Sequence, residues 1–166
     1  MESRERTRLL MGGLILITLG VLVILLGYPA QLLSADKCEE TVRKLNGSLH
    51  PRIDETELVL ILKALNETDN KKLPPKFIIK SRARKLCWKP GEDLWASGML
   101  KGKSIGGDAF GNREGRLPNG KRVWHEADLG YAGGRRGPKR IVYSNDGLRR
   151  ITVDHYKTFK EVPPCQ

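Results

Sequence analysis

The spacing of hydrophobic residues changes along the chain, and each spacing predicts a different kind of element. Residues 9–26 are almost wholly apolar and carry no charge. Farther on, Leu58, Leu62 and Leu65 recur at helical spacing and give a helix one buried stripe. In the last third of the chain apolar and polar residues alternate, which is typical of strands with one face in a core. The pattern therefore predicts an apolar N-terminal segment, then helices, then strands.

Polar residues mark the ends of the predicted helices. Asp54 precedes the apolar stripe and can cap free N–H groups, and Glu57 follows three residues later in a capping-box-like pattern. The polar run 66–70 ends this first helix. Ser81 is a candidate cap for a second, short helix that extends to Leu86.

Three segments with period two are predicted strands, separated by turns rich in glycine, proline and asparagine. They cover residues 122–127, 139–144 and 150–156. Helices that precede strands indicate an α+β fold, in which N-terminal helices pack on one face of an antiparallel β-sheet.

The apolar segment 9–26 has the features of an export signal. It is longer than the roughly 7–15 apolar residues of a secretory signal and shorter than the roughly 20 of a spanning helix. Arginines precede it, which favours a cytoplasmic start, and Leu33-Ser34-Ala35 offers small residues to a signal peptidase. Residues 1–35 are thus a signal peptide cleaved after Ala35 or a retained anchor that contacts the membrane through residues 9–26. Either places the remainder outside the cytoplasm, secreted or membrane-anchored.

Charge and cysteine content narrow the class of partner and the compartment. The net charge of +11 and the isoelectric point near 9.8 favour a polyanion, either a nucleic acid or an anionic membrane surface. Three cysteines in an exported chain suggest one disulfide and one leftover thiol. The three histidines are scattered and no Cys-x-x-Cys is present, so no metal site is expected.

A glycine-rich stretch, residues 102–115, is the strongest candidate for a ligand-binding loop. Glycine permits tight turns and close approach of the backbone to a ligand. Backbone N–H groups, the Glu114 carboxylate and the Phe110 ring suit a nucleobase, which needs a flat apolar contact and hydrogen bonds at its edge. The competing interpretation is a glycine-rich hairpin connection. A P-loop is excluded, because position 97, where its first glycine would fall, is serine.

Several separated motifs together resemble the barnase-like bacterial ribonucleases that prefer guanine. Residues 103–115 (KSIGGDAFGNREG) look like the guanine-binding loop of that family. Trp124–Asp128, Arg140–Ser144 and Asp154–Phe159 also match it, in order and in spacing. The resemblance covers roughly residues 55–162 and implies the microbial ribonuclease fold. We therefore divide the chain into the signal or anchor (1–35), a connecting or accessory segment (36–53) with a short helix near residues 39–44, and a ribonuclease domain (54–166).

The resemblance assigns roles to residues whose ordinary explanation would be structural. A mid-strand glutamate is usually a solvated cross-strand partner, and a lone histidine or a basic turn is usually structural. By resemblance, Glu126 is the proton acceptor and His155 the proton donor. Arg136 and Arg140 match the phosphate-binding arginines, and Lys80 matches a lysine that supports the transition state. His125, although adjacent to Glu126, is expected on the opposite sheet face and receives no catalytic role.

The same resemblance implies a base pocket, a disulfide and partners. The substrate-binding residues are Phe110, Asn112, Arg113, Glu114 and Tyr156. Cys38 pairs with Cys165, because some ribonucleases of this superfamily join their chain ends in this way. The implied function is metal-independent cleavage of single-stranded RNA after guanine, by transesterification to a 2′,3′-cyclic phosphate and then hydrolysis, and it requires no cofactor. An acidic, barstar-like inhibitor is a further expected partner. The competing function is a non-catalytic, membrane-tethered module that binds polyanions.

Overall fold

The computed structural model describes residues 37–165. The signal or anchor predicted at residues 1–35 lies outside the described residues. Within the described part, none of the helices has the length and apolarity needed to cross a membrane.

Two helices begin the described chain. Helix α2 (Lys37–Gly47) is longer than the short helix expected there, and it buries Cys38 and Val42. Helix α3 (Glu55–Glu67) begins where predicted, because the Asp54 carboxylate accepts a hydrogen bond of 2.9 Å from the Glu57 N–H. It also ends within the predicted polar run. The Glu57 side chain does not complete a capping box, since it is buried and accepts a hydrogen bond of 2.6 Å from the distant Gly130 N–H.

The strands of the described residues form one sheet in chain order, β1 to β6. Strand β1 pairs with β2 in parallel, and all later neighbours pair antiparallel. The α+β prediction is confirmed, but the sheet is mixed and not wholly antiparallel as expected. The strands are β1 (Phe77–Ile78), β2 (Ser104–Phe110), β3 (Trp124–Asp128), β4 (Arg140–Ser144), β5 (Arg149–Thr152) and β6 (Lys160–Glu161).

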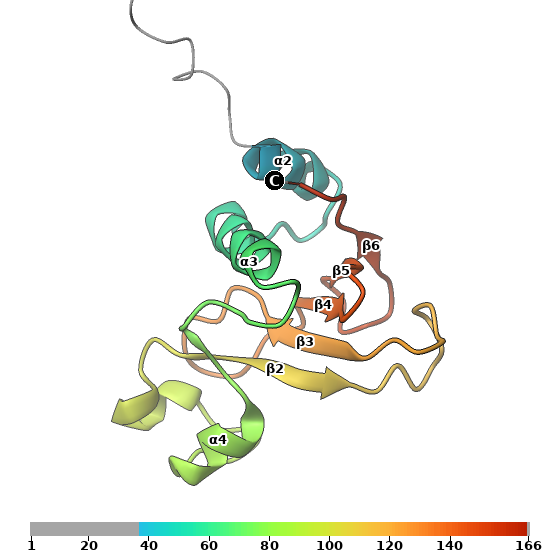
Figure 1. The fold of residues 1–166 in the computed structure, drawn as a ribbon. Helices are drawn as coiled ribbons and strands as arrows, with labels where there is room; N and C mark the ends of the chain where they lie inside the picture. The colour runs from blue at the N-terminus through green and yellow to red at the C-terminus, as the bar shows by residue number, and fades with distance from the viewer. Residues whose placement is uncertain (1–36, 166) are drawn as a thin grey trace, which may run out of the picture. The chain divides into compact units, whose positions relative to one another are not determined.

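The alternation along each strand divides the side chains between two faces of the sheet. Helices α2 and α3 pack over one face (Figure 1), where Ala127, Ile141 and Ile151 join the core with the stripe of α3. The opposite face carries a smaller cluster built on Trp124 and Val142, with several aromatic rings packed against it. This second face leaves room for a site, because neither α2 nor α3 contributes to its cluster.

Strand β2 corrects the prediction that residues 102–115 form a loop throughout. Their first half is a strand, and glycine serves packing there: a Cβ on Gly106 would lie 2.6 Å from a Phe77 carbon and 2.7 Å from the Ala127 Cβ. Gly107, with φ of +94°, lies at a shift of register between β2 and β3. Glycine in a strand often marks such a bulge or close approach. The part that remains a loop follows Phe110.

Two other element boundaries also differ from the predictions. Helix α4 (Lys80–Lys85) begins after Ile79 and has no side-chain cap from its own sequence. Ser81 is therefore not the cap. The Asp108 carboxylate of β2 accepts from the Lys80 N–H at 2.9 Å instead. Strand β5 ends at Thr152 and does not continue to residue 156.

The ends of the described chain are joined by the disulfide that the resemblance implied. Cys38 in α2 and Cys165 near the C-terminus are bonded, with 127 residues of separation and a Cα–Cα distance of 4.8 Å. The Asn66 side chain of α3 donates to the Cys165 carbonyl at 2.8 Å. Cys87 is exposed and forms no disulfide within the described residues.

Candidate active site

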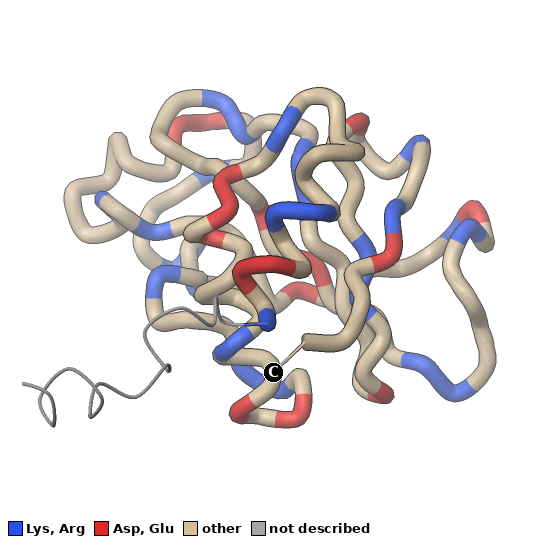
Figure 2. Tube along the Cα trace, turned by 90° about the horizontal axis from the view of Figure 1, so that it is seen from above, with Lys and Arg blue, Asp and Glu red and all other residues tan. Residues whose placement is uncertain are grey.

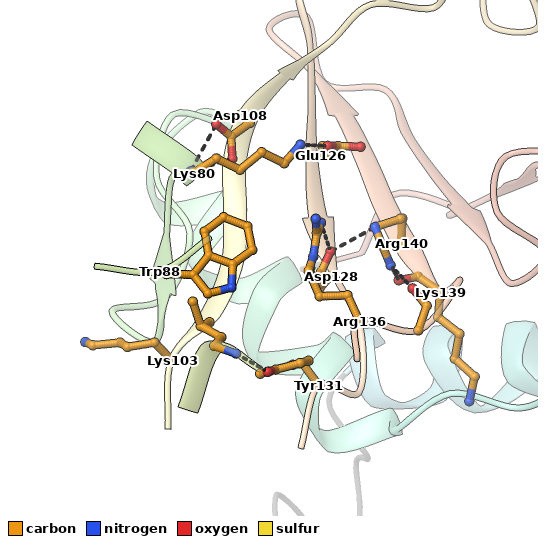
Figure 3. Close-up of polar contacts among 12 residues, drawn as sticks. Lys80, Trp88, Lys103, Asp108, Glu126, Asp128, Tyr131, Arg136, Lys139 and Arg140 are labelled. Atoms are coloured by element: carbon orange, nitrogen blue, oxygen red, sulfur yellow. Dashed lines mark hydrogen bonds and ion pairs between the residues drawn. The ribbon is translucent and has the colours of Figure 1, made fainter. Parts of the chain in front are cut away.

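Glu126 lies on β3, on the face that α2 and α3 leave open, and is only 7% exposed. Figure 3 shows the Lys80 side chain extended to the Glu126 carboxylate. The Lys80 ammonium donates to one carboxylate oxygen at 2.6 Å, and the Tyr156 hydroxyl donates to the other oxygen. Both partners come from distant elements, α4 and the bend after β5. Each oxygen of the buried carboxylate is thus engaged.

The partners of Glu126 decide its ionisation. Burial by itself acts to raise the pKa of Glu126. The hydrogen bonds from Lys80 and Tyr156, together with the charges of Lys80 and Arg140, outweigh burial and lower that pKa below its ordinary value. Burial and the neighbouring Glu126 carboxylate raise the pKa of the Tyr156 phenol, so it remains a donor. The carboxylate is therefore held as an anion, which is the state of a proton acceptor.

Lys80 reaches Glu126 because α4 is tied to strand β2. The Asp108 carboxylate accepts a hydrogen bond from the Lys80 backbone N–H at the start of the helix. The Lys80 side chain extends across to β3 (Figure 3). Asp108 was not singled out from the sequence. Its role depends on a contact across 28 positions of the chain, which no local pattern reveals.

Asp128 is the second residue that the sequence did not single out. It is 2% exposed and lies two residues after Glu126, so both project from the same face of β3. Its carboxylate accepts two hydrogen bonds from Arg136, at 2.5 and 2.7 Å, and forms an ion pair with Arg140 Nε at 2.8 Å (Figure 3). Burial acts to lower the pKa of Arg136, but the bonds and charge of Asp128 outweigh it and raise that pKa. Asp128 thus places both predicted phosphate-binding arginines beside Glu126.

His155 lies in a bend after β5, with a left-handed φ of +60°. Its side chain is exposed, and its backbone N–H donates to the Pro138 carbonyl at 3.3 Å, next to the arginine loop. Asp154 shapes the bend by accepting hydrogen bonds from the Thr152 hydroxyl at 2.8 Å and from the Thr158 N–H at 3.0 Å. The placement of His155 therefore comes from a turn and not from a strand end.

A pocket of about 530 Å³ lies between the predicted catalytic pair, Glu126 and His155, and the glycine-rich loop. Glu126, His155 and Tyr156 line one part of it, and the loop after β2 lines the remainder. The structure thus brings the predicted proton acceptor, proton donor and base-binding residues around one space. The predicted substrate-binding residues in its lining are Phe110, Asn112, Arg113, Glu114 and Tyr156.

The loop residues within the pocket do different things. The Asn112 amide closes the loop on itself, since it donates to the Leu117 carbonyl at 2.8 Å and accepts from the Leu117 N–H at 3.0 Å. The exposed Glu114 carboxylate makes no hydrogen bond or ion pair with residues 37–165, so it is available to a ligand. The Phe110 and Tyr156 rings lie 5.1 Å apart and tilted by 32°, at one wall of the pocket.

His125 points away from the pocket, as expected from the alternation of β3. Its ring stacks on Tyr143 with centroids 5.6 Å apart, and both residues line a different hollow. Within residues 37–165, no group of three His, Cys, Asp or Glu side chains is placed to hold a metal ion.

A carboxylate and an imidazole line one pocket on the open face of the sheet, and two arginines lie beside the carboxylate. This set of groups is typical of hydrolases that cleave nucleic acids. Comparison with known proteins identifies the family. A family model described as ribonuclease matches residues 63–163. The chain belongs to this family, the barnase/binase family of ribonucleases.

The relatives agree with this assignment. A ribonuclease of Heyndrickxia coagulans is 48% identical over 93 residues, which cover 55% of this chain and 84% of that protein. Ribonucleases of Bacillus intermedius and Bacillus pumilus are each 48% identical over 93 residues, and the match spans 57% of their length.

Proposed function

We propose that the protein is a metal-independent endoribonuclease that cleaves single-stranded RNA after guanine. The observation that carries this proposal is the buried Glu126 carboxylate, kept ionised by Lys80 and Tyr156, in the pocket that His155 also lines. An ionised carboxylate and an imidazole at one pocket supply a proton acceptor and a proton donor without any cofactor.

The first step forms a cyclic phosphate. Glu126 takes the proton of the ribose 2′-hydroxyl, and the 2′-oxygen attacks the adjacent phosphorus. The bond from phosphorus to the 5′-oxygen breaks, and His155 gives that oxygen its proton. Arg136 and Arg140, which Asp128 holds beside Glu126, stabilise the charge on the phosphoryl oxygens. DNA is not cleaved, because it lacks the attacking 2′-hydroxyl.

The second step hydrolyses the 2′,3′-cyclic phosphate with the roles reversed. His155 takes a proton from water, whose oxygen attacks phosphorus. The bond to the 2′-oxygen breaks, and Glu126 returns the proton to that oxygen. The products are a 3′-phosphate and the free 2′-hydroxyl, and both catalytic groups regain their starting states.

Guanine preference is assigned to Glu114. Its carboxylate can accept hydrogen bonds from guanine N1–H and from the 2-amino group, a donor pair that adenine lacks. The exposure of Glu114 and its freedom from partners within residues 37–165 support this role. Phe110 and Tyr156 supply flat apolar surface at the same pocket.

The proposed cellular setting rests on the N-terminal segment. The charge-free run 9–26 behind three arginines supports action outside the cytoplasm, as a secreted or membrane-anchored protein. Mass spectrometry of the N-terminus distinguishes cleavage near Ala35 from retention. A barstar-like acidic inhibitor is a proposed partner, since a net charge of +11 speeds association with an acidic protein.

A single experiment separates the proposed enzyme from a non-catalytic polyanion-binding module. The purified protein is incubated with RNA in EDTA, and the product ends are analysed over time. We expect 2′,3′-cyclic phosphates on guanosine to appear first and 3′-phosphates later. Binding without cleavage would favour the non-catalytic module, and cleavage that EDTA abolishes would contradict the proposed mechanism.

A further inference from the structure

A second hollow, of about 820 Å³, lies on the side of β3 that faces away from Glu126. It is lined by the sheet residues His125 and Tyr143, by glycines of β2, and by residues of the 69–79 segment and α4. The proposed reaction uses none of these residues. The hollow therefore needs an explanation of its own.

The floor of the hollow is flat and partly aromatic. His125 is half-buried and stacks on the buried Tyr143 with an interplanar angle of 26°, and its Nδ1 lies 3.3 Å from the Gly107 carbonyl. Gly107 adds backbone without a side chain of its own, and a Cβ at this position would lie 3.2 Å from the Ile79 Cγ2. Beside it, Ile79 is 42% exposed although it is a large hydrophobic residue. This floor offers a planar apolar contact to a ligand.

The rim of the hollow is basic. Two of its four cations are already engaged, since Lys71 lies 3.6 Å from Asp69 and Lys103 donates to the Pro75 carbonyl at 3.0 Å. The other two, Lys72 and Arg82, are exposed, and their side chains make no hydrogen bond or ion pair with the described part of the chain. Two cations thus remain available beside the aromatic floor.

The surrounding segment carries most of the excess charge. Residues 71–103 hold ten lysines and arginines against two acidic residues, a net of +8 within a chain whose total is +11. Lysines and arginines occur around the whole described chain (Figure 2), but acidic residues offset them more fully elsewhere. The field near the hollow is therefore strongly positive and attracts polyanions.

We propose that this hollow is a second binding subsite for single-stranded RNA, on the sheet face opposite the catalytic pocket. One base stacks on His125, and the flanking phosphates contact Lys72 and Arg82. Aromatic rings that accept bases beside cations that contact phosphates are the recurring elements of single-strand recognition. A flat anionic membrane would not use a recessed ring, so the hollow favours a nucleotide chain. This inference rests on the proposed function for its choice of RNA.

The subsite has a consequence that depends on substrate length. A dinucleotide fills the catalytic pocket alone, whereas a long strand also engages the hollow. The hollow therefore lowers KM for long RNA and leaves the cleavage of dinucleotides unchanged.

The first test removes the two available cations. Lys72→Ala/Arg82→Ala is compared with Lys89→Ala/Lys101→Ala, which removes two exposed cations of the same segment that do not line the hollow. The full-length protein is titrated with a fluorescent single-stranded DNA of 20 nucleotides, which cannot be cleaved. We expect the first variant to bind about fivefold or more weakly, and its plot of log affinity against log salt to be shallower by about 1.4, for two lost phosphate contacts. The matched variant should change binding less than about twofold.

The second test addresses the floor. His125→Ala should weaken DNA binding by about fivefold or more, because a stacked base loses its ring. His125→Phe keeps a flat ring and should restore binding. Failure of the phenylalanine variant to restore binding would overturn the stacking role.

Cleavage of the dinucleotide GpU is measured on every variant and should match that of the wild type. If the wild type cleaves no dinucleotide, the proposed reaction fails, while DNA binding still reports on the hollow. If both double variants bind DNA equally more weakly than the wild type, binding responds to the total charge of the protein, and the proposed subsite is wrong. Unchanged DNA binding, together with lost binding to vesicles of 30% phosphatidylserine in phosphatidylcholine, would assign the cations to a membrane surface instead.

Discussion

At the residue scale, the chemistry depends on how a few side chains hold one another. Glu126 is the clearest case, because burial and its two hydrogen-bond donors act on its pKa in opposite directions and the donors prevail. Without Lys80 and Tyr156, burial would raise the pKa of a carboxylate at this position. Its ionised state is a property of the cluster.

Alanine variants of Glu126 and His155 test the division of proton transfer. Each should reduce kcat/KM for GpU by about 10²–10⁴-fold, the usual contribution of a positioned acid or base. The pH profile of the wild type should be bell-shaped. It should lose its low-pH limb in Glu126→Ala and its high-pH limb in His155→Ala. Activity near the wild-type level in both variants would refute the assignment.

Lys80 should determine where the low-pH limb lies. The lowered pKa of Glu126 places that limb of kcat/KM below pH 4.5, the ordinary value for the group. Lys80→Met removes the charge and hydrogen bond while burial remains, so the pKa rises and the limb moves to higher pH. Lys85→Met, at the exposed end of α4, serves as the control and should leave the limb in place. A limb that does not move would show that Lys80 does not control the carboxylate.

Glu114→Gln should weaken cleavage after guanine selectively. The variant exchanges one acceptor oxygen for a donor, and we expect a loss of about 1–3 kcal/mol in transition-state stabilisation for guanine substrates. The measurement compares kcat/KM for GpU and ApU. Cleavage after adenine should change much less. Equal losses for both bases would show that Glu114 supports the folded structure and does not recognise the base.

At the scale of elements, turns place the functional groups that the strands alone do not. The bend after β5 holds His155 and Tyr156 at left-handed φ values of +60° and +69°. Thr152 accepts the Tyr156 N–H at 2.9 Å, and Asp154 accepts from both sides of the bend. A regular strand through the same residues, as the period-two pattern predicted, would leave His155 with an extended backbone.

Asp154 should link the stability of this bend to pH. Burial acts to raise the pKa of Asp154, but the hydrogen bonds from Thr158 and Thr152 outweigh it and lower that pKa to about 2, from 3.8. The folded state therefore favours the ionised form, and this contribution is present above about pH 4 and lost as the pH falls to about 2. Asp154→Asn should lower the free energy of unfolding at pH 7, and the difference from wild type should shrink across that window.

Urea unfolding at a series of pH values measures this effect. Glu92→Gln is the control, because Glu92 is exposed and outside the bend. The difference in free energy of unfolding between Glu92→Gln and the wild type should not shrink between about pH 4 and about pH 2 in the same way. If the loss of unfolding free energy in Asp154→Asn does not change with pH, the ionisation of Asp154 does not stabilise the bend.

At the scale of the whole molecule, long-range links join the ends of the described chain to the core. The disulfide from Cys38 to Cys165 spans 127 positions, and α2 packs with α3 over the sheet. The candidate catalytic pocket lies on the opposite face of the sheet. The disulfide is therefore expected to support stability without contributing to the chemistry.

Replacing both Cys38 and Cys165 with alanine should lower the free energy of unfolding by about 4–5 kcal/mol, the loop-entropy estimate for a loop of this length. Cleavage of GpU at a temperature where the variant remains folded should not change. Cys87→Ala, which alters an exposed cysteine outside any disulfide of the described residues, should change stability by less than about 0.5 kcal/mol. Wild-type stability in the double variant would contradict a stabilising role for this bond.

The sequence by itself determined the features that depend on near neighbours. The Asp54 cap and the apolar stripe defined α3. The alternation near Glu126 predicted β3 and the placement of His125 on the opposite face of the sheet. Ordered motifs then indicated the family and the candidate site. These succeed because caps, periodicity and motif spacing are local along the chain.

Tertiary structure alone decided the contacts between distant segments. Gly106 belongs to a strand because Phe77 and Ala127 crowd its backbone, and not because of its own preference. Asp108 caps α4 across 28 positions, and Asp128 places arginines from a later loop and strand. Lys80 lies just after β1 and Tyr156 just after β5, yet both donate to Glu126 on β3. Such contacts form only when the chain closes on itself, so the ionisation of the site could not be predicted from local patterns.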